Sequence, residues 1–314
     1  MKKWPTSAAT LIGIPLDLGA KNLGVDIGPD AFRHQGIIDK LSSAGLEVKD
    51  YGDIKSRDRS ELEPGDDRLR YLEEIVRVSE ETAKLTNEII GRQEHVIAIG
   101  GDHSINLGVV AGASAALNGD LGLIYLDAHG DMNTADTTQT GNIHGMHLAS
   151  LLGFGDERLI NVHHEGAKIA KEHLLHIGGS DLDQPEIDLM EREKLPHFKL
   201  VDLLCDGMRP LLDMIDALAN KVSHTWVSLD LDVIDRVYAP GAGMPNPGGL
   251  SYREIAAIAE YIGMKCNVVG IDVVEYNPLQ DENKKTAELG IELIAKFFGS
   301  NYSWYTGYMA ANKL

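Results

Sequence analysis

Leu123-Ile-Tyr-Leu-Asp127-Ala-His129-Gly-Asp131 is the stretch from which the fold and its site can be predicted. Residues 123–126 are branched or aromatic, as in a strand buried within a parallel sheet. Asp127, His129 and Asp131 then take alternate positions, which point to one face of an extended chain. Three candidate metal ligands therefore leave the carboxyl end of a strand, where open α/β sheets place their sites. An acidic turn is the alternative.

Strand-like and helical segments alternate along the whole chain. Strands are expected at 8–14, 46–51, 95–99, 121–127, 173–177, 198–201, 225–232 and 267–274. Amphipathic stretches lie between them, at 29–43, 67–90, 104–117, 143–153, 185–194, 206–221, 251–263 and 284–298. This alternation predicts an α/β fold, with a mainly parallel sheet and helices on both faces. We expect one domain over residues 1–314.

Three predicted helix starts carry local signals. Pro29 lies where a first helical turn accepts proline. Ser104 is a candidate N-cap. Ser251-Tyr-Arg-Glu254 matches a capping box before an apolar run.

Composition limits the partners and the compartment. The formal net charge of −19 over 314 residues argues against nucleic acid or an anionic membrane as partner. Cys205 and Cys266 form no CxxC motif, and we expect both to be small buried hydrophobes in a reducing cytosol. The amino terminus does not resemble a signal peptide, and no apolar segment is long enough to span a bilayer. A cytoplasmic location is expected.

Other predicted strand ends carry similar side chains. His103 follows one strand, Asp230 and Asp232 end another, and Glu275 follows the last. Alone, His103 has a structural explanation as a hydrogen-bonded histidine, and the aspartates have one as a cap or turn. Because carboxyl ends of parallel strands share one edge of a sheet, these residues are expected to meet. The combined set of candidate ligands is His103, Asp127, His129, Asp131, Asp230 and Asp232.

The charges in this set favour two metal ions over one. Four carboxylates close together repel one another and raise each other's pKa values, whereas two divalent cations cancel their charge. Oxygen-rich ligation with two imidazoles and no thiolate favours Mn²⁺ over Mg²⁺, Fe²⁺ or Zn²⁺. Two metals about 3.5–4 Å apart hold water activated for attack near neutral pH. The chemistry indicated is metal-assisted hydrolysis.

The sequence resembles the ureohydrolase family, and within it the arginases, over nearly its whole length. The motifs that carry the resemblance are Gly100-Gly-Asp-His103, Asp127-Ala-His129-Gly-Asp131, Ser228-Leu-Asp230-Leu-Asp232, Gly248-Gly-Leu-Ser-Tyr-Arg-Glu254 and Asp272-Val-Val-Glu275-Tyr-Asn-Pro278. The resemblance implies a three-layer α/β/α fold around an eight-stranded, mainly parallel sheet. It also implies two Mn²⁺ ions per subunit.

The resemblance implies that each metal has one histidine and one aspartate of its own, and that two aspartates bridge the pair. The sets are His103 with Asp131 at a first metal position, His129 with Asp232 at a second, and Asp127 with Asp230 as bridges. Asp131 would also contact the attacking hydroxide and pass on its proton. His144 would assist the proton transfer, a task that suits its ordinary pKa near 6.5. Glu275 would pair with the substrate guanidinium.

Two further segments resemble those that hold the amino-acid end of the substrate. Asn133, Thr140 and Asn142 would bind the α-carboxylate through neutral donors; the alternative is a polar turn. Asp183, supported by Glu186, would recognise the α-amino group; the alternative is an acidic cluster at a helix start.

Two positions depart from the family pattern. Met244 stands where the family has threonine, which removes a hydroxyl near the substrate and adds bulk. The segment Ile234-Asp235-Arg-Val also differs from the common Leu-Asp-Pro.

The function expected is that of a manganese hydrolase that cleaves L-arginine to L-ornithine and urea. One alternative is a ureohydrolase for agmatine or a guanidino acid. Others are a non-catalytic metal-binding paralogue and a deacetylase of the same fold with a single zinc. The family forms trimers or hexamers, so a homo-oligomer is expected. The aromatic residues of the carboxyl-terminal tail, about residues 299–314, suit an interface; the alternative is that they pack on their own subunit.

Overall fold

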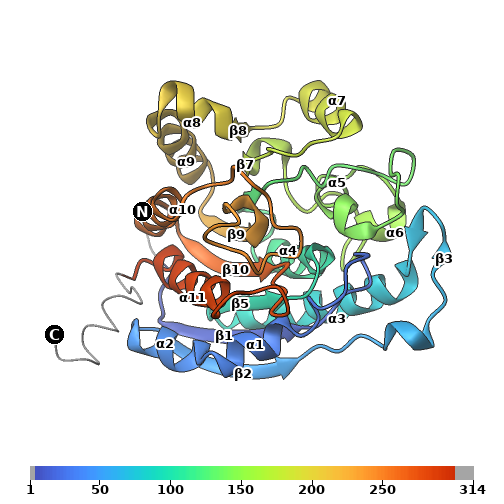
Figure 1. Ribbon diagram of the computed structural model, residues 1–314, viewed down its shortest axis with the longest axis horizontal. Helices are drawn as coiled ribbons and strands as arrows, with labels where there is room; N and C mark the ends of the chain where they lie inside the picture. Colours follow the sequence, from blue (N-terminus) through green and yellow to red (C-terminus); the bar gives the residue numbers. More distant parts are fainter. Residues whose placement is uncertain (1–3, 301–314) are drawn as a thin grey trace.

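An eight-stranded parallel sheet forms the centre of the molecule (Figure 1) in the computed structural model, which describes residues 4–300. The strands are β1 (Ala8–Ile14), β2 (Glu47–Asp53), β5 (His95–Gly100), β6 (Leu121–Asp127), β7 (Leu174–Gly178), β8 (His197–Lys199), β9 (His224–Asp230) and β10 (Val268–Val274). Their order across the sheet is β2-β1-β5-β10-β9-β6-β7-β8. All eight predicted strands are present and every neighbouring pair is parallel, so the predicted fold class is confirmed.

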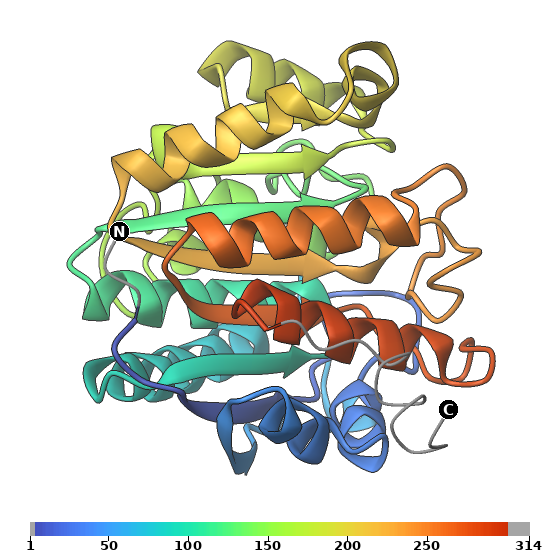
Figure 2. The ribbon, with the colours of Figure 1, turned by 90° about the vertical axis from the view of Figure 1, so that its left-hand side faces the viewer.

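Helices cover both faces of the sheet, and Figure 2 shows one helical layer in front of it. That layer contains α1 (Gly28–His34), α2 (Ile37–Ser43), α8 (Leu200–Asp206), α9 (Arg209–Lys221), α10 (Tyr252–Lys265) and α11 (Lys285–Phe297). The opposite face carries α3 (Leu72–Gly91), α4 (Asn106–Ala116), α5 (His147–Leu151), α6 (Glu157–Ile160) and α7 (Gln184–Glu193).

Short elements complete the described part of the chain. They are the antiparallel ribbon β3 (Gly65–Asp66) and β4 (Leu69–Arg70), and the 3₁₀ turns η1 (Arg59–Glu61), η2 (His103–Ile105), η3 (Ile143–Met146), η4 (Lys171–His173) and η5 (Leu231–Val233). Within residues 4–300 no helix is long and apolar enough to cross a membrane.

The central strands are apolar on both faces because each face packs against a helical layer. Every residue of β5, β6 and β10 is buried. Along β6, Leu123 and Tyr125 belong to the core under α3 and α4, whereas Ile124 and Leu126 belong to the core under α9–α11. The continuous apolar run before Asp127 is therefore what a strand buried on both faces requires.

Several predicted helix boundaries differ from those observed. The stretch 29–43 is two helices, because Gly36 adopts a left-handed conformation (φ 79°) between them. Helix α3 starts at Leu72, later than predicted, because the preceding residues form the β3–β4 ribbon. After a three-residue β8, residues 200–206 are helical, although 198–201 were expected to be a strand.

Two other predictions are wrong, and two are confirmed. Asp102, not Ser104, caps η2, because its Oδ1 accepts a hydrogen bond from the Ser104 N–H (2.9 Å). Cys205 is exposed on α8, whereas Cys266 is buried as expected. The capping box at Ser251 and the proline in the first turn of α1 are both present. Residues 301–314, which make up most of the tail predicted at an interface, lie outside the described residues.

Glu74 on α3 is a buried carboxylate held by two arginines. Its side chain is 2% exposed and pairs with Arg57 (2.8 Å) and Arg77 (2.7 Å), and it accepts the Arg57 N–H (2.9 Å). Burial alone would raise the pKa of Glu74, but the bonds to Arg77 and Arg57 outweigh it and lower the pKa to about 2. The pKa of Glu74 is lower in the folded protein than in the unfolded chain, where it is near 4.5. The ionised carboxylate therefore makes its full contribution to stability above about pH 4.5 and loses it as the pH falls towards 2.

We predict that Glu74→Gln lowers the free energy of unfolding at pH 7 by about 1–2 kcal/mol, a range that allows for solvent screening of the half-exposed arginines. The difference from the unmodified protein should shrink as pH falls from about 4.5 towards 2, since Glu74 is then protonated in both states. Urea unfolding at several pH values measures it. Glu81→Gln, which removes an exposed partner of Arg77, is the control; equal midpoints for Glu74→Gln and Glu81→Gln at pH 7 would contradict the prediction.

Candidate metal centre

The candidate ligands meet at the carboxyl edge of the four central strands. Asp127 ends β6 and Asp230 ends β9. Asp232 lies in η5 just beyond β9, and His103 begins η2 just beyond β5. Since β5, β10, β9 and β6 are neighbours in the sheet, segments far apart in sequence deliver these side chains to one place.

The structure groups the six predicted ligands around two positions. At the first, His103 Nδ1 lies 3.0 Å from Asp127 Oδ2, 3.3 Å from Asp230 Oδ2 and 3.4 Å from Asp131 Oδ2. At the second, His129 Nδ1 lies 3.0 Å from Asp232 Oδ2 and 3.4 Å from Asp127 Oδ1. Asp127 thus faces both positions, one with each oxygen.

Asp230 is less clearly shared than Asp127. Its Oδ2 belongs to the first group, while its Oδ1 accepts a hydrogen bond from the Asp232 N–H (2.9 Å). The structure therefore brings Asp230 to the centre and places it with His103.

The electrostatics of the centre call for cations. Within residues 4–300, the ion pairs of these four aspartates involve histidines alone. Burial, then the charges of Asp232 and Asp127, raises the pKa of Asp230 well above its usual value. Burial and Asp127 also raise the pKa of Asp232 to about 6. The histidines beside Asp127 and Asp131 outweigh burial and lower their pKa values instead. A buried set of carboxylates and imidazoles such as this fits divalent metal ions.

A chain of hydrogen bonds behind His103 fixes the orientation of its ring. His103 Nε2 donates to Ser228 Oγ (2.8 Å), and Ser228 Oγ donates to Asp272 Oδ2 (2.7 Å). Asn106 Nδ2 donates to Ser228 Oγ (3.1 Å) and to Asp272 Oδ1 (2.8 Å). With the proton on Nε2, the Nδ1 lone pair is left to face the aspartates, as a metal-ligating histidine requires.

The backbone around the second histidine is similarly constrained. His129 O accepts a hydrogen bond from His176 Nε2 (2.8 Å). At Gly178 (φ 131°), a Cβ would lie 2.0 Å from the Asp127 carbonyl oxygen, so only glycine fits beside the ligand strand.

Asp131 and Glu275 have left-handed backbones, with φ of 48° and 58°. Non-glycine residues rarely adopt this conformation, and it costs free energy that the surrounding structure must offset. Two candidate catalytic residues thus lie on strained turns after β6 and β10, which is typical of functional sites.

Glu275 lies beside the first metal position and contacts His144. Its side chain is 5% exposed, and Oε1 accepts the His103 N–H (3.1 Å) and lies 3.3 Å from His144 Nδ1. Burial alone would lower the pKa of His144, but Glu275 outweighs it and raises the pKa to about 9. The contact with Glu275 therefore moves the pKa of His144 above its ordinary value of 6.5. Met244, at the departure from the family pattern, is 39% exposed.

The loop after Asp131 brings two predicted substrate residues together. Asn133 Nδ2 donates to Asp183 Oδ2 (2.9 Å). Thr140 is exposed, and its hydroxyl accepts the Asn142 N–H (3.2 Å). Hydrogen bonds within the loop also form the polar turn considered as the alternative.

Asp183 and Glu186 form the capping box of α7, the structural alternative considered for them. Glu186 is buried, and its Oε1 accepts the Met132 N–H (3.1 Å). Burial, then the charge of Asp131, raises the pKa of Glu186 to about 7. Through these hydrogen bonds to Met132 and Asn133, Glu186 and Asp183 hold the loop that follows the candidate metal ligands.

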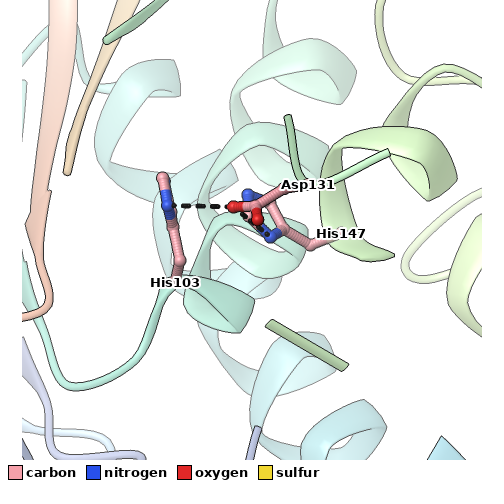
Figure 3. A group of neighbouring side chains, drawn as sticks. All are labelled: His103, Asp131 and His147. Atoms are coloured by element: carbon pink, nitrogen blue, oxygen red, sulfur yellow. Dashed lines mark ion pairs between the residues drawn. The ribbon is translucent and has the colours of Figure 1, made fainter. Parts of the chain in front are cut away.

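The sequence reasoning missed Tyr125 and His147. The Tyr125 hydroxyl contacts Asp131, and Figure 3 shows His147 and His103 on different sides of that aspartate. Both signals were available. Tyr125 shares the alternation that grouped residues 127, 129 and 131, and His147 lies three positions after His144 at the start of α5.

Comparisons with known proteins agree with this geometry. The model of the Arginase family matches residues 7–299. The arginase of Brevibacillus brevis is 38% identical over 293 residues, which cover 92% of this chain and 97% of the relative. The native structure of Bacillus caldovelox arginase at pH 5.6 has a TM-score of 0.90 at 36% identity, covering 94% of this chain and 99% of that one. The agmatine ureohydrolase of Thermoplasma volcanium, at 23% identity and a TM-score of 0.72, shares the fold.

We predict that Ser228→Ala weakens divalent-metal binding about 10- to 100-fold, because the His103 ring loses the acceptor that fixes its tautomer. Calorimetric titration of the metal-free protein with Mn²⁺ measures this. Ser114→Ala is the matched control, since Ser114 is also buried and donates to the Lys168 carbonyl oxygen (2.6 Å) away from the centre. Equal Mn²⁺ affinity in Ser228→Ala and Ser114→Ala would contradict the role given to Ser228.

Proposed function

The chain belongs to the arginase family of metal-dependent hydrolases, and we propose that it is a manganese arginase, which cleaves L-arginine to L-ornithine and urea. The observation that carries the proposal is a cluster of largely buried histidines and aspartates in which Asp127 joins two of the three groups that could hold a metal, one through His103 and one through His129. This donor set of hard oxygens and two imidazoles suits two Mn²⁺ ions.

We assign the ligands as the resemblance implies. The first position takes His103 and Asp131, the second takes His129 and Asp232, and Asp127 and Asp230 bridge them. When bound, the two cations supply a water activated for attack near neutral pH and offset the charge of the carboxylates.

Glu275 is proposed to hold the substrate guanidinium. A carboxylate accepts two parallel N–H bonds from a planar guanidinium, which fixes the orientation of the reacting carbon. Among residues 4–300, the ion-pair partner of Glu275 is His144, and no arginine or lysine occupies it. Its place beside the first group would bring the guanidinium carbon to the metal centre.

Asp131 and His144 are proposed to handle the protons. Water adds to the guanidinium carbon, and Asp131 accepts the proton that this water releases. The bond from that carbon to the ornithine nitrogen then breaks, and the nitrogen must gain a proton to leave as an amine. His144, which lies 3.3 Å from Glu275, is the residue proposed to give a proton to this nitrogen.

The amino-acid end of the substrate is proposed to lie against Asn133, Thr140 and Asn142 through its carboxylate and against Asp183, backed by Glu186, through its ammonium group. The 2.9 Å bond between Asn133 and Asp183 supports this assignment. The two substrate groups are attached to one carbon, so their binding groups must be neighbours.

We also propose a cytoplasmic location and a trimeric or hexameric assembly. The free, exposed thiol of Cys205 suits a reducing compartment. The assembly rests on family membership, and light scattering at micromolar concentration tests it: a monomer would contradict it.

We predict urea release from L-arginine by the manganese-loaded protein, and none after chelation of the metal. Agmatine should react at least about 100-fold less efficiently, because it lacks the carboxylate for which Asn133, Thr140 and Asn142 supply donors. A urea assay over a panel of guanidino compounds measures both. Preferred turnover of agmatine or a guanidino acid would support the alternative ureohydrolase, and no urea from any compound would indicate a non-catalytic paralogue.

Metal content should separate the bridging ligand from the others. Asp127→Ala is expected to lose both metals, since Asp127 faces both positions, whereas His103→Ala should lose mainly one. Elemental analysis of protein dialysed against low Mn²⁺ gives the stoichiometry. Retention of one full equivalent by Asp127→Ala would refute its role as the bridge.

A further inference from the structure

The Tyr125 hydroxyl lies among the ligand atoms of the first metal position. Tyr125 is fully buried on β6. Its oxygen is 2.6 Å from Asp131 Oδ2, 2.9 Å from Asp127 Oδ2 and 3.2 Å from His103 Nδ1. Three atoms assigned to the first metal therefore surround one phenol oxygen, which no role described above uses.

The spacing of these atoms is that of donors to a common cation. A hard divalent ion with bonds of about 2.1 Å in octahedral geometry holds adjacent donor atoms about 3 Å apart. The distances from His103 Nδ1 to Asp127, Asp230 and Asp131 run from 3.0 to 3.4 Å, in this range. The Tyr125 oxygen lies 2.6–3.2 Å from three of these atoms, which is close enough for a further member of the set.

His147 provides the acceptor for the phenol proton. His147 Nδ1 donates to the His144 carbonyl oxygen (2.6 Å), because a carbonyl can only accept. The other ring nitrogen, Nε2, lies 3.1 Å from the Tyr125 oxygen. Of the four acceptors around this hydroxyl, His147 Nε2 is the one outside the assigned ligand set. As placed here, the hydroxyl donates to Asp131 Oδ2 and Asp127 Oδ2. Donation to His147 Nε2 instead would leave an oxygen lone pair directed at the ligand atoms.

We propose that Tyr125 supplies a further oxygen donor to the first metal, and that His147 holds the phenol in place by accepting a hydrogen bond from its hydroxyl. This inference rests on the proposed function, because it requires the two-metal centre. It makes the centre asymmetric, since the first metal gains a donor that the second lacks. A firmly held first metal would anchor the site beside Glu275, while the second keeps more room for water.

The geometry assigns His147 to positioning rather than to ligation. Its Nδ1 is engaged by the His144 carbonyl oxygen and lies 3.6 Å from Asp131 Oδ2, and its Nε2 faces the phenol. The ring is also fully buried against His103, with ring centres 4.3 Å apart, so packing holds it where it is (Figure 3).

Tyr125→Phe is the first test, because it removes the oxygen and keeps the ring. Calorimetric Mn²⁺ titration of the full-length protein should show one of the two sites weakened about 10- to 100-fold and the other nearly unchanged. Tyr252→Phe is the matched control, since the Tyr252 hydroxyl also donates to a carboxylate, Glu292 (2.8 Å), on the far helical layer. Circular dichroism of the metal-free variants checks that both fold.

The role of His147 is tested by two substitutions. Glutamine can place a side-chain oxygen near the position of Nε2 and accept a hydrogen bond from the Tyr125 hydroxyl, whereas leucine cannot. His147→Leu should weaken the same Mn²⁺ site as Tyr125→Phe. His147→Gln should bind Mn²⁺ at that site more tightly than His147→Leu does, but less tightly than the unmodified protein. Combining Tyr125→Phe with His147→Leu should weaken the site no further than Tyr125→Phe alone, because His147 acts through the phenol.

A crystal structure of the manganese-loaded protein, measured at the manganese absorption edge, gives the direct readout. The inference predicts that the Tyr125 oxygen lies within about 2.4 Å of the first Mn²⁺. Two Mn²⁺ ions with the oxygen beyond about 3 Å, and unchanged affinities in Tyr125→Phe, would overturn the inference and leave the proposed function standing. Failure of the unmodified protein to bind two Mn²⁺ ions would overturn both.

Discussion

The rest of the structure depends on the repulsion among four buried aspartates. Carboxylates this close and this far from solvent stabilise a fold only when positive charge lies between them. In residues 4–300 their ion-pair partners are histidines, with no arginine or lysine among them. The pKa values of Asp230 and Asp232 therefore rise, because burial and the neighbouring carboxylates disfavour their charge. Such a cluster could hold metal ions, and cations between the carboxylates would offset their repulsion.

The parallel sheet places the residues of the centre side by side, because the carboxyl ends of its strands lie at one edge. Neighbouring strands deliver Asp127 and Asp230 to one edge. The turn after β6 adds the candidate ligands His129 and Asp131, and η2 and η5 add His103 and Asp232. The apolar strands below are packed between two helical layers, which hold these ends rigidly. The strained backbones at Asp131 and Glu275 persist because this packing offsets their cost. Stability is thus concentrated in the sheet, and chemistry in the turns at its carboxyl edge.

Behind the candidate ligand His103, the side chains of Ser228, Asp272 and Trp226 form one hydrogen-bonded chain. Ser228 and Asp272 set the tautomer of His103, and Asp272 also accepts a bond from Trp226. These contacts join β9, β10 and η2, so the orientation of a single imidazole depends on strands that are distant in sequence. The contact between His144 and Glu275 also joins distant parts of the chain. Glu275, 131 positions away in sequence, raises the pKa of His144.

The sequence by itself determined the eight strands, the α/β class and the six residues that meet at the centre. Continuous apolar runs ending in Asp and His are local patterns, and parallel strands must bring their ends to one edge. Element boundaries were predicted less well, as at residues 200–206, Ser104 and the break at Gly36, because a neighbouring cap or a single glycine conformation shifts where a helix begins or ends. Only the tertiary structure decided that Asp230 sits with His103, that Glu275 raises the pKa of His144, and that Tyr125 and His147 join the site. Each depends on a distance between side chains from separate elements, which no spacing along the chain specifies.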